Sequence, residues 1–379
     1  MSNAAQAPVI PNYARFDVTF ESGDGAWLYA EDGKEYLDFG AGIAVITLGH
    51  CHPQVVAAAH AQLDTLWHTS NLYWTNPMAE LARALSARFG GAQTYFCNSG
   101  AESIEAGLKY ARKATGKPGI VALENSFHGR TFGALSVTGQ PAKHMGFTPL
   151  VPDVRFAKQN DAESLAAAAA DGKVGCILIE PIQGEGGVNP TTPEFLASAA
   201  ELARSEGALL FFDEVQSGTG RTGTFFAYEQ LGTQPDLTAL AKGLANGLPI
   251  GALLVSDTAA RGFEPGDHAT TFGGNPVSCA AALAVEAALT SELLAHVQMV
   301  GAHLAEGLRQ IPGIRDVRGR GLMLGAELDQ PALDIIGACV ERGLLLTSAG
   351  TNVLRFTPPL VIEAAHVDRA LTIVHEVLT

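Results

Sequence analysis

Short apolar segments alternate with helical segments through the middle of this chain, from about residue 54 to residue 255. The expected helices span 54–66, 77–89, 101–115, 161–170 and 193–206, and the expected strands are Gln93–Cys97, Gly119–Leu123, Gly175–Ile179, Ala208–Phe212, Leu237–Ala241 and Ala252–Val255. This alternation predicts an α/β fold with a mostly parallel sheet covered by helices on both faces. Ligands of such sheets bind beyond the carboxyl ends of the strands, so the residues that follow each strand are the candidates for a site.

The two ends of the chain carry a different pattern. Residues 18–40 alternate between apolar and polar, with glycine-containing turns, which predicts short antiparallel strands. After Asn275-Pro276 an alanine-rich helical pattern runs to about Leu308, and short strands and helices follow it to the end. We therefore expect a large domain over residues 45–276 and a small α+β domain built from residues 1–44 and 277–379.

Composition excludes several classes of protein. The chain has 379 residues, 47% hydrophobic and 17% charged, which is typical of a globular protein with a large core. Its net charge is −15 and it has no Lys/Arg cluster, so we expect no nucleic-acid partner. Five scattered cysteines without a CxxC pair predict neither a metal site nor disulfides, and favour a reducing compartment. Because we find neither a signal peptide nor an uninterrupted membrane-spanning run, we expect a cytoplasmic protein without membrane contact.

One lysine stands out. Lys242 is the only charged residue in the apolar run Leu237–Ser256, and the preceding predicted strand leads into Asp213-Glu214-Val215-Gln216. Apolar surroundings lower the pKa of a lysine, which makes its amine nucleophilic. Pyridoxal phosphate needs such a pair: a lysine that bonds to its aldehyde and an acid that keeps its ring nitrogen protonated. The pair therefore predicts a pyridoxal-phosphate site.

Three more segments follow predicted strands. In Asn98–Glu105, small residues open a helix whose free N–H groups suit a phosphate, although an ordinary turn with Ser99 as helix cap gives the same pattern. In Ser126–Thr131, Phe127 could stack on a planar ring and Arg130 could bind a carboxylate, or the loop could simply expose an arginine. The glycine-rich Glu180–Gly187 places two carboxylates at the same edge, or is only a turn.

Two later segments add candidates, and one is a weak alternative. The loop Thr270–Pro276 offers hydroxyl groups suited to a phosphate or a carboxylate. Arg355 lies in an apolar strand and needs an anion, which is either a structural ion pair or a substrate. Gly218–Gly223 matches the dinucleotide pattern GxGxxG, but it lies away from the strand end and opens no clear helix, so a nicotinamide site is a minor alternative. We expect His128 to be a packed or hydrogen-bonded loop histidine rather than a catalyst.

Taken together, these segments resemble the class-III (subgroup II) aminotransferases, which use pyridoxal phosphate. The resemblance covers nearly the whole chain, from Asp32–Phe39 to Val353–Leu360. The segments most similar to the acetylornithine aminotransferase branch are Leu48–Pro53, His68–Leu72, Phe127–Arg130, Glu180–Gly187 and Asp213–Gln216. The resemblance implies fold type I of the pyridoxal-phosphate transferases, with a mostly parallel large-domain sheet and a smaller α+β domain.

The resemblance also implies roles for individual residues. Lys242 would bond to the cofactor and act as the base, Asp213 would pair with the ring nitrogen, and Phe127 would stack on the ring. Further implied cofactor contacts are Ser99, Gly100, Ala101, Glu214, Val215, Gln216 and Thr271, the last reaching the neighbouring subunit's cofactor, which implies a homodimer with shared sites. The implied substrate contacts are Arg130, Glu185, Thr270 and Arg355.

The implied reaction is ping-pong transamination of N2-acetylornithine with 2-oxoglutarate, giving N-acetylglutamate 5-semialdehyde and glutamate. Glu185 would pair with Arg355 until the α-carboxylate of glutamate replaces it. Relatives that use succinylornithine, ornithine, 4-aminobutyrate, or carrier-bound or free lysine derivatives share these residues, so the amino donor stays open. A non-catalytic effector-binding protein is the alternative from another class, and the presence of Lys242, Asp213 and Phe127 together argues against it.

Overall fold

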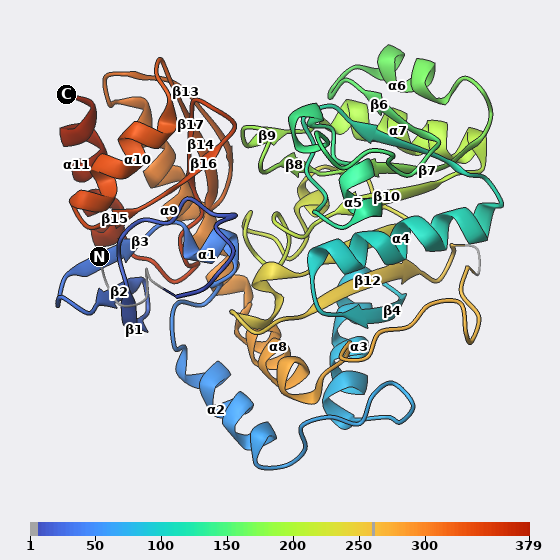
Figure 1. The fold of residues 1–379 in the computed structure, drawn as a ribbon, viewed down its shortest axis with the longest axis horizontal. Helices are drawn as coiled ribbons and strands as arrows, with labels where there is room; N and C mark the ends of the chain where they lie inside the picture. Colours follow the sequence, from blue (N-terminus) through green and yellow to red (C-terminus); the bar gives the residue numbers. More distant parts are fainter. Residues whose placement is uncertain (1–6, 260–261) are drawn as a thin grey trace.

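A sheet of seven strands forms the centre of the right-hand lobe in Figure 1. The computed structural model describes residues 7–259 and 262–379. The strand order is β4 (Ala92–Cys97), β12 (Gly251–Ser256), β11 (Leu237–Leu240), β10 (Leu209–Asp213), β7 (Val174–Ile179), β5 (Gly119–Leu123) and β6 (Val154–Ala157). Only the pairs made by β12 are antiparallel among the pairings of this sheet, so the predicted α/β fold with a mostly parallel sheet is confirmed. The prediction missed β6, an edge strand whose apolar run is interrupted by Arg155.

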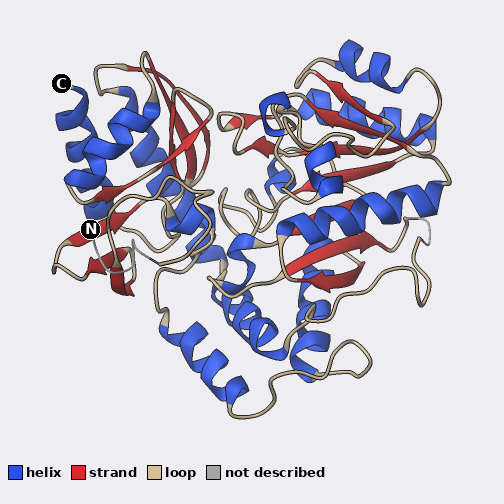
Figure 2. Cartoon of the chain, viewed as in Figure 1, coloured by secondary structure: helices blue, strands red, loops and turns tan. Residues whose placement is uncertain are grey.

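Helices cover both faces of this sheet, as Figure 2 shows. On one face α4 (Gly100–Thr115) packs across β12, β11, β10 and β7, where it buries Leu209 and Phe211. On the other face α3 (Asn76–Phe89), α6 (Ala162–Ala169) and α7 (Pro193–Glu206) pack on the strands, and Leu210 and Phe212 are buried there. Successive residues of β10 thus point to opposite faces, as the period of a strand requires. Each fully buried side chain of this size contributes about 1.5–3 kcal/mol to folding.

Two smaller sheets lie beside the central sheet, and the first of them joins the two ends of the chain. The first sheet contains β1 (Phe20–Asp24), β2 (Trp27–Ala30) and β3 (Glu35–Asp38), and β3 pairs in parallel with β15 (Leu344–Leu345). The second is antiparallel and contains β13 (Ile314–Arg320), β14 (Met323–Leu328), β17 (Val353–Phe356) and β16 (Thr347–Ala349). The helix α10 (Ala332–Glu341) packs on β15, β16 and β17, and α11 (Ala364–Leu378) packs on α10. These pairings support the expected small domain, whose limits remain a prediction and whose residues 1–6 lie outside the described residues.

The predicted helical pattern from residue 276 to Leu308 is two helices, not one. The helices α8 (Pro276–Ala288) and α9 (Ser291–Arg309) meet at an angle of 74°. Leu289 leaves the helical conformation, and the side chain of Thr290 accepts a hydrogen bond from the Leu293 amide, which begins a new helix. Because α8 packs against α3 and α2 (Pro53–Leu63), we propose that the domain boundary lies at this bend rather than at residue 276.

The remaining described elements are short. They include α1 (Ala41–Ala44), α5 (Phe132–Ser136), the hairpin of β8 (Ile182–Gln183) with β9 (Asn189–Pro190), and the 3-10 turns at Pro141–Lys143, Ala227–Gln230 and Lys242–Ala245. No single helix in residues 7–259 and 262–379 has the length and apolar composition to cross a membrane, and α8 with α9 passes that test only as a bent pair.

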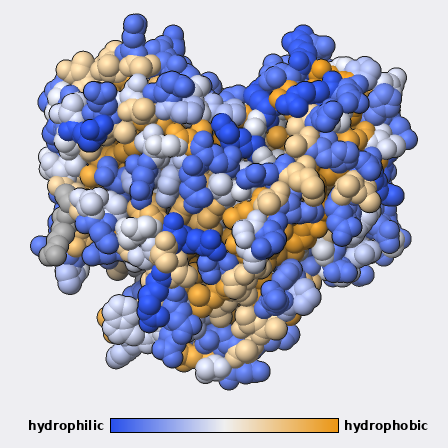
Figure 3. Space-filling view, turned by 180° about the vertical axis from the view of Figure 1, so that it is seen from behind, coloured by the Kyte–Doolittle hydropathy of each residue, from blue (hydrophilic) through white to orange (hydrophobic). Residues whose placement is uncertain are grey.

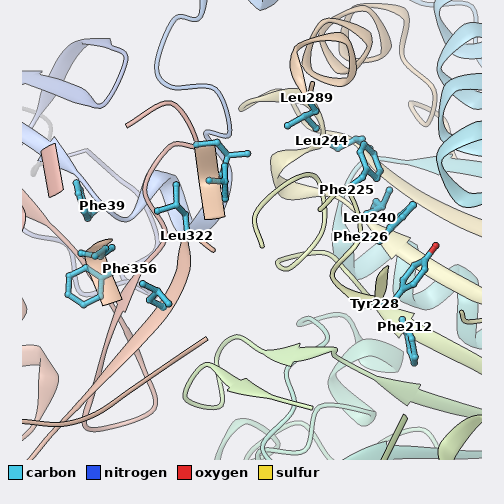
Figure 4. Close-up of a cluster of buried hydrophobic side chains, with 14 of the residues drawn as sticks. Phe39, Phe212, Phe225, Phe226, Tyr228, Leu240, Leu244, Leu289, Leu322 and Phe356 are labelled. Atoms are coloured by element: carbon cyan, nitrogen blue, oxygen red, sulfur yellow. The ribbon is translucent and has the colours of Figure 1, made fainter. Parts of the chain in front are cut away.

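One contiguous buried cluster links the central sheet to the C-terminal elements. Figure 4 shows Phe212 and Leu240 of the sheet at one end of this cluster, and Phe39 and Phe356 at the other. Phe225, Phe226, Tyr228, Leu244, Leu289 and Leu322 are also labelled in the same view. The segments that carry the candidate site are therefore supported by a common core.

The close approach of α4 to the sheet depends on Gly107. A Cβ atom at this position would lie 2.2 Å from the ring of Phe211, whereas a Cβ atom at Gly337 of α10 would meet nothing within 4 Å. We therefore expect Gly107→Ala to lower the free energy of unfolding by about 1–3 kcal/mol through overpacking. The matched variant Gly337→Ala should leave stability unchanged or raise it by up to about 1 kcal/mol. Thermal unfolding of both variants checks this, and equal melting temperatures would contradict it.

Candidate active site

The residues that follow β4, β5, β7, β10 and β11 converge on one cavity of about 300 Å³. Strand ends in a parallel sheet meet at one edge, which explains the convergence. The predicted site residues that line this cavity are Ser99, Gly100, Ala101, Phe127, Glu185, Asp213, Val215, Gln216 and Lys242. His128 and Glu180 line it as well.

Lys242 follows β11 and begins a short 3-10 turn with a positive φ of 42°, a strained conformation for a residue other than glycine. No group in the described part of the chain accepts a hydrogen bond from its Nζ. Burial lowers the pKa of Lys242, and the positive charge of Arg355 lowers it further, whereas Glu185, Asp213 and Glu180 oppose the shift. The Lys242 amine therefore lies in the cavity and loses its proton more readily than an exposed lysine does.

Asp213 ends β10 and is fixed by two hydrogen bonds. Its Oδ2 lies 2.7 Å from Nδ1 of His128, and its Oδ1 accepts from the Val215 amide at 3.0 Å. Since an ionised carboxylate only accepts, Nδ1 of His128 carries the proton in this pair. Nε2 of the same ring is buried without a partner among the described residues. The prediction of a hydrogen-bonded loop histidine is confirmed, and its partner is the candidate acid.

The start of α4 forms an anion cradle. Ser99 caps the helix by accepting from the Glu102 amide at 3.2 Å, while the amides of Gly100 and Ala101 belong to the first turn and have no partner within the helix. A Cβ atom on Gly100 would lie 2.7 Å from Val215, so only glycine fits where the helix start meets the β10 loop. The helix dipole favours a negative group here, which fits a phosphate.

An ion pair closes the cavity on the side of the C-terminal sheet. Arg355 of β17 pairs through Nη1 with Glu185, and the same nitrogen donates to Oε1 of Gln216 at 3.2 Å. Its Nε donates to the Thr347 hydroxyl at 3.0 Å. Burial by itself raises the pKa of Glu185, but the charge and hydrogen bond of Arg355 outweigh burial and hold that pKa below its ordinary value.

Besides Arg355, four predicted residues lie outside the cavity lining. The Arg130 guanidinium lies 5.5 Å from the ring centre of Phe127, at the mouth of the site. The Thr270 hydroxyl accepts from Asn98 at 3.1 Å. Thr271 lines a separate surface pocket. Glu214 points away: its carboxylate accepts from the Ser217 hydroxyl at 2.6 Å and the Tyr228 amide at 3.0 Å, and burial raises its pKa to about 7. A cofactor contact of the Glu214 side chain therefore has no support.

The sequence pattern places the carboxylate of Glu180 at this edge of the sheet but gives it no role in the site. It follows β7 directly, as Asp213 ends the adjacent strand β10, so its place at a strand end was the available signal. The GxGxxG segment Gly218–Gly223 opens no helix, and Arg221 within it is buried and donates to the carbonyl oxygens of Leu322 and Pro358. It therefore anchors the C-terminal segments and does not provide a dinucleotide site.

Three features lie on one edge of the sheet: a lysine with a lowered pKa, a fixed acid at the next strand end, and a glycine-lined helix start that suits an anion. This combination defines a pyridoxal-phosphate enzyme of fold type I. The residues present fit this cofactor, because the cradle, the acid and the amine all face the same cavity. The chain belongs to the family described as Aminotransferase class-III, whose model matches residues 9–378. Members of that family depend on pyridoxal phosphate, so this protein is a pyridoxal-phosphate-dependent aminotransferase.

Known proteins cover nearly the whole chain. It is 46% identical to the acetylornithine aminotransferase of Aquifex aeolicus, over 97% of this chain and 98% of that protein. It is 47% identical to the protein of the same name from Gloeobacter violaceus, over 100% and 97%. A structure of N-acetylornithine aminotransferase from Stenotrophomonas maltophilia has a TM-score of 0.84 and 36% identity, over 97% of this chain and 96% of that chain.

A second solved relative is the ornithine aminotransferase of Toxoplasma gondii, with a TM-score of 0.94 and 33% identity, over 99% of this chain and 92% of that chain. Its description reports partial occupancy of pyridoxal phosphate at the active site. The solved relatives thus include proteins named for two different amino donors.

Proposed function

We propose that this enzyme transfers the amino group of N2-acetylornithine to 2-oxoglutarate, which forms N-acetylglutamate 5-semialdehyde and glutamate in arginine biosynthesis. The observation that carries the proposal is the Glu185–Arg355 ion pair beside Lys242, since it gives the cavity a carboxylate site that can be closed or opened. The names of the relatives at 46% and 47% identity support this donor. A cytoplasmic location is part of the same proposal and is supported by the free cysteines.

The residues at the cavity have distinct proposed roles. When bound, the cofactor supplies the aldehyde that takes up the amino group and the ring that withdraws negative charge from the donor carbon. Lys242 would bond to it in the resting enzyme, and its freed Nζ would then move a proton from the donor carbon. Asp213 would hold the proton on the ring nitrogen, with His128 fixing its Oδ2. Gly100 and Ala101 would bind the phosphate through their amides, with Ser99 beside them.

Other lining residues would orient the ring and the substrate. Phe127 would cover one face of the cofactor ring. Val215, which lies beside Gly100, would line the opposite side of the cavity. Gln216 would face the 3-oxygen of the ring. At the mouth, Arg130 would hold the carboxylate of acetylornithine that lies far from the reacting amine, with Thr270 as a further substrate contact.

The ion pair explains how two donors use one cavity. Acetylornithine reacts through an amine that carries no carboxylate on the same carbon, so Arg355 would be left as a buried unpaired cation unless Glu185 neutralised it. Glutamate reacts beside its α-carboxylate, which would displace Glu185 and pair with Arg355. The same pocket would therefore offer a neutral wall to one donor and a cation to the other.

We expect Glu185→Gln to change the preference between donors. The amide removes the negative charge that neutralises Arg355, so the acetylornithine half-reaction should lose about tenfold or more in kcat/KM relative to the glutamate half-reaction. Single-turnover kinetics with each donor in the absence of a second substrate measure this ratio. An unchanged ratio would remove the proposed switch.

A panel of amino donors tests the proposed substrate. With 2-oxoglutarate as acceptor, acetylornithine should give the highest kcat/KM among acetylornithine, succinylornithine, ornithine, 4-aminobutyrate and lysine derivatives. Lys242→Ala is the control: it should lose the visible absorbance of the linked cofactor, which borohydride bleaches in the wild type, and all turnover with it. A clear preference for ornithine, as the name of one solved relative suggests for that protein, would replace the proposed donor.

We also propose a homodimer that completes the site. Leu72 and Trp74 are 84% and 86% exposed, and they line a surface pocket of about 790 Å³ together with Thr270 and Thr271. Apolar surface also gathers in a band across one face of the molecule (Figure 3). Exposed apolar patches of this kind mark protein interfaces, and a partner seated here would bring Thr271 to the partner's cofactor, as the family resemblance implies.

Sedimentation of the purified protein should give twice the chain mass. Trp74→Glu should shift it to the monomer because a charge would be buried in the interface. The matched variant Met299→Glu replaces another apolar side chain that is 65% exposed, on α9, and should stay dimeric. A monomeric wild type would refute shared sites.

A further inference from the structure

Glu180 is a buried carboxylate with two different backbone partners. It is 5% exposed and follows the last residue of β7. Its Oε1 accepts from the Phe127 amide at 2.8 Å, and its Oε2 accepts from the Gly184 amide at 3.0 Å. One side chain therefore holds two loops that are far apart in the sequence.

The first of these loops carries the groups that face the cofactor ring. Phe127 lines the cavity, and the next residue is His128, whose Nδ1 pairs with Asp213. His128 is itself tied back through its amide to the Thr138 hydroxyl at 3.0 Å. A shift of the Phe127 amide would therefore move both the ring cover and the partner of the acid.

The second loop carries the anion that neutralises Arg355. Gly184 directly precedes Glu185, and it packs so closely on Gln216 that an added Cβ atom would lie 2.5 Å from the amide of that side chain. Gln216 in turn accepts from Nη1 of Arg355. The Gly184 amide is thus a fixed point beside the ion pair.

We propose that Glu180 is a positioning residue that sets the Glu185–Arg355 pair relative to the cofactor ring by holding the Phe127 and Gly184 amides at the same time. The inference rests on the proposed function in one respect: the exchange of donors uses the Glu185–Arg355 ion pair. Because both oxygens accept from N–H groups, glutamine cannot replace glutamate here: its NH₂ group would face one of the two donors. Aspartate keeps both acceptors but is one methylene shorter.

The surroundings of Glu180 change the pKa of its carboxyl group. Burial raises its pKa to about 7, the negative charge of Asp213 adds to the rise, and His128 and the two amides oppose it. Lys242 and Glu185 line the same cavity as Glu180, and the charge of Glu180 acts on Lys242. As pH falls through about 7, Glu180 gains a proton and one of its oxygens becomes a donor, so acid should loosen the same contacts that glutamine loosens.

Hydrogen exchange in the holoenzyme tests the positioning role directly. In Glu180→Gln the segments that contain Phe127 and Gly184 should exchange about tenfold faster than in the wild type, since one charge-assisted hydrogen bond is lost and the other is weakened. The matched control is Glu201→Gln, an exposed position on α7, which should exchange like the wild type. If Glu180→Gln does not fold, Glu180→Asp replaces it, with faster exchange expected in at least one of the two segments.

Kinetics supply the second readout. Loosening Glu185 exposes Arg355, so Glu180→Gln should shift the ratio of the two half-reactions toward glutamate by about tenfold, in the same direction as Glu185→Gln. The double variant should shift the ratio no further than Glu185→Gln alone, because both act on one contact. In the wild type, the rate of the acetylornithine half-reaction should decline as pH falls through about 7. This decline should be absent in Glu180→Gln.

Normal exchange in both segments, or an unchanged donor ratio in Glu180→Gln, would overturn the inference. If the donor panel identifies another amine, that amine takes the place of acetylornithine in the ratio. The exchange measurement needs no donor, so it separates failure of the positioning role from failure of the proposed substrate.

Discussion

The site depends on keeping the amine of Lys242 in the cavity without a hydrogen-bond partner among the described residues. Burial and Arg355 lower its pKa, whereas Glu185, Asp213 and Glu180 oppose the shift. Burial and Arg355 therefore outweigh the three carboxylates around this amine. The positive φ of Lys242 adds strain, and α8 packs against the turn that Lys242 begins. Bonding of a cofactor aldehyde to this amine would not require breaking an ion pair among the described residues.

Much of this arrangement could be predicted from the sequence, because strand ends are visible as changes from apolar to polar residues. Asp213 and Lys242 follow buried strands, and a parallel sheet brings such residues to one edge. The same rule placed Glu180 after β7 at this edge, with a simple glycine-rich turn as the alternative, but only the structure shows the two amides that its carboxylate holds. Gly100 was predictable as part of a cradle, whereas its contact with Val215 depends on two strands that only the fold brings together.

Other features depend on side-chain direction, which the resemblance did not convey. The family segment Asp213–Gln216 was taken as one cofactor-binding unit, yet Asp213 and Val215 face the cavity and Glu214 faces Ser217 and Tyr228. Alternation at the end of β10 separates Asp213 from Glu214, and the turn that follows brings both Val215 and Gln216 to the cavity. The bend between α8 and α9 was hidden for a different reason: Ala-rich and Leu-rich segments continue the helical pattern across Leu289, and only the cap at Thr290 marks the break.

The structure also indicates which partner of the ion pair would move in the proposed exchange of donors. Arg355 lies on β17, an interior strand between β14 and β16, and its side chain is 3% exposed. Glu185 is 27% exposed and precedes two glycines, of which Gly187 has a φ of 122°. Backbone at glycine can change conformation with little steric cost, whereas moving Arg355 would break its hydrogen bonds to Thr347 and Gln216. Arg355 is therefore the fixed partner and Glu185 the movable one. The Gly184 amide, which Glu180 holds, is the fixed point from which the Glu185 side chain would move.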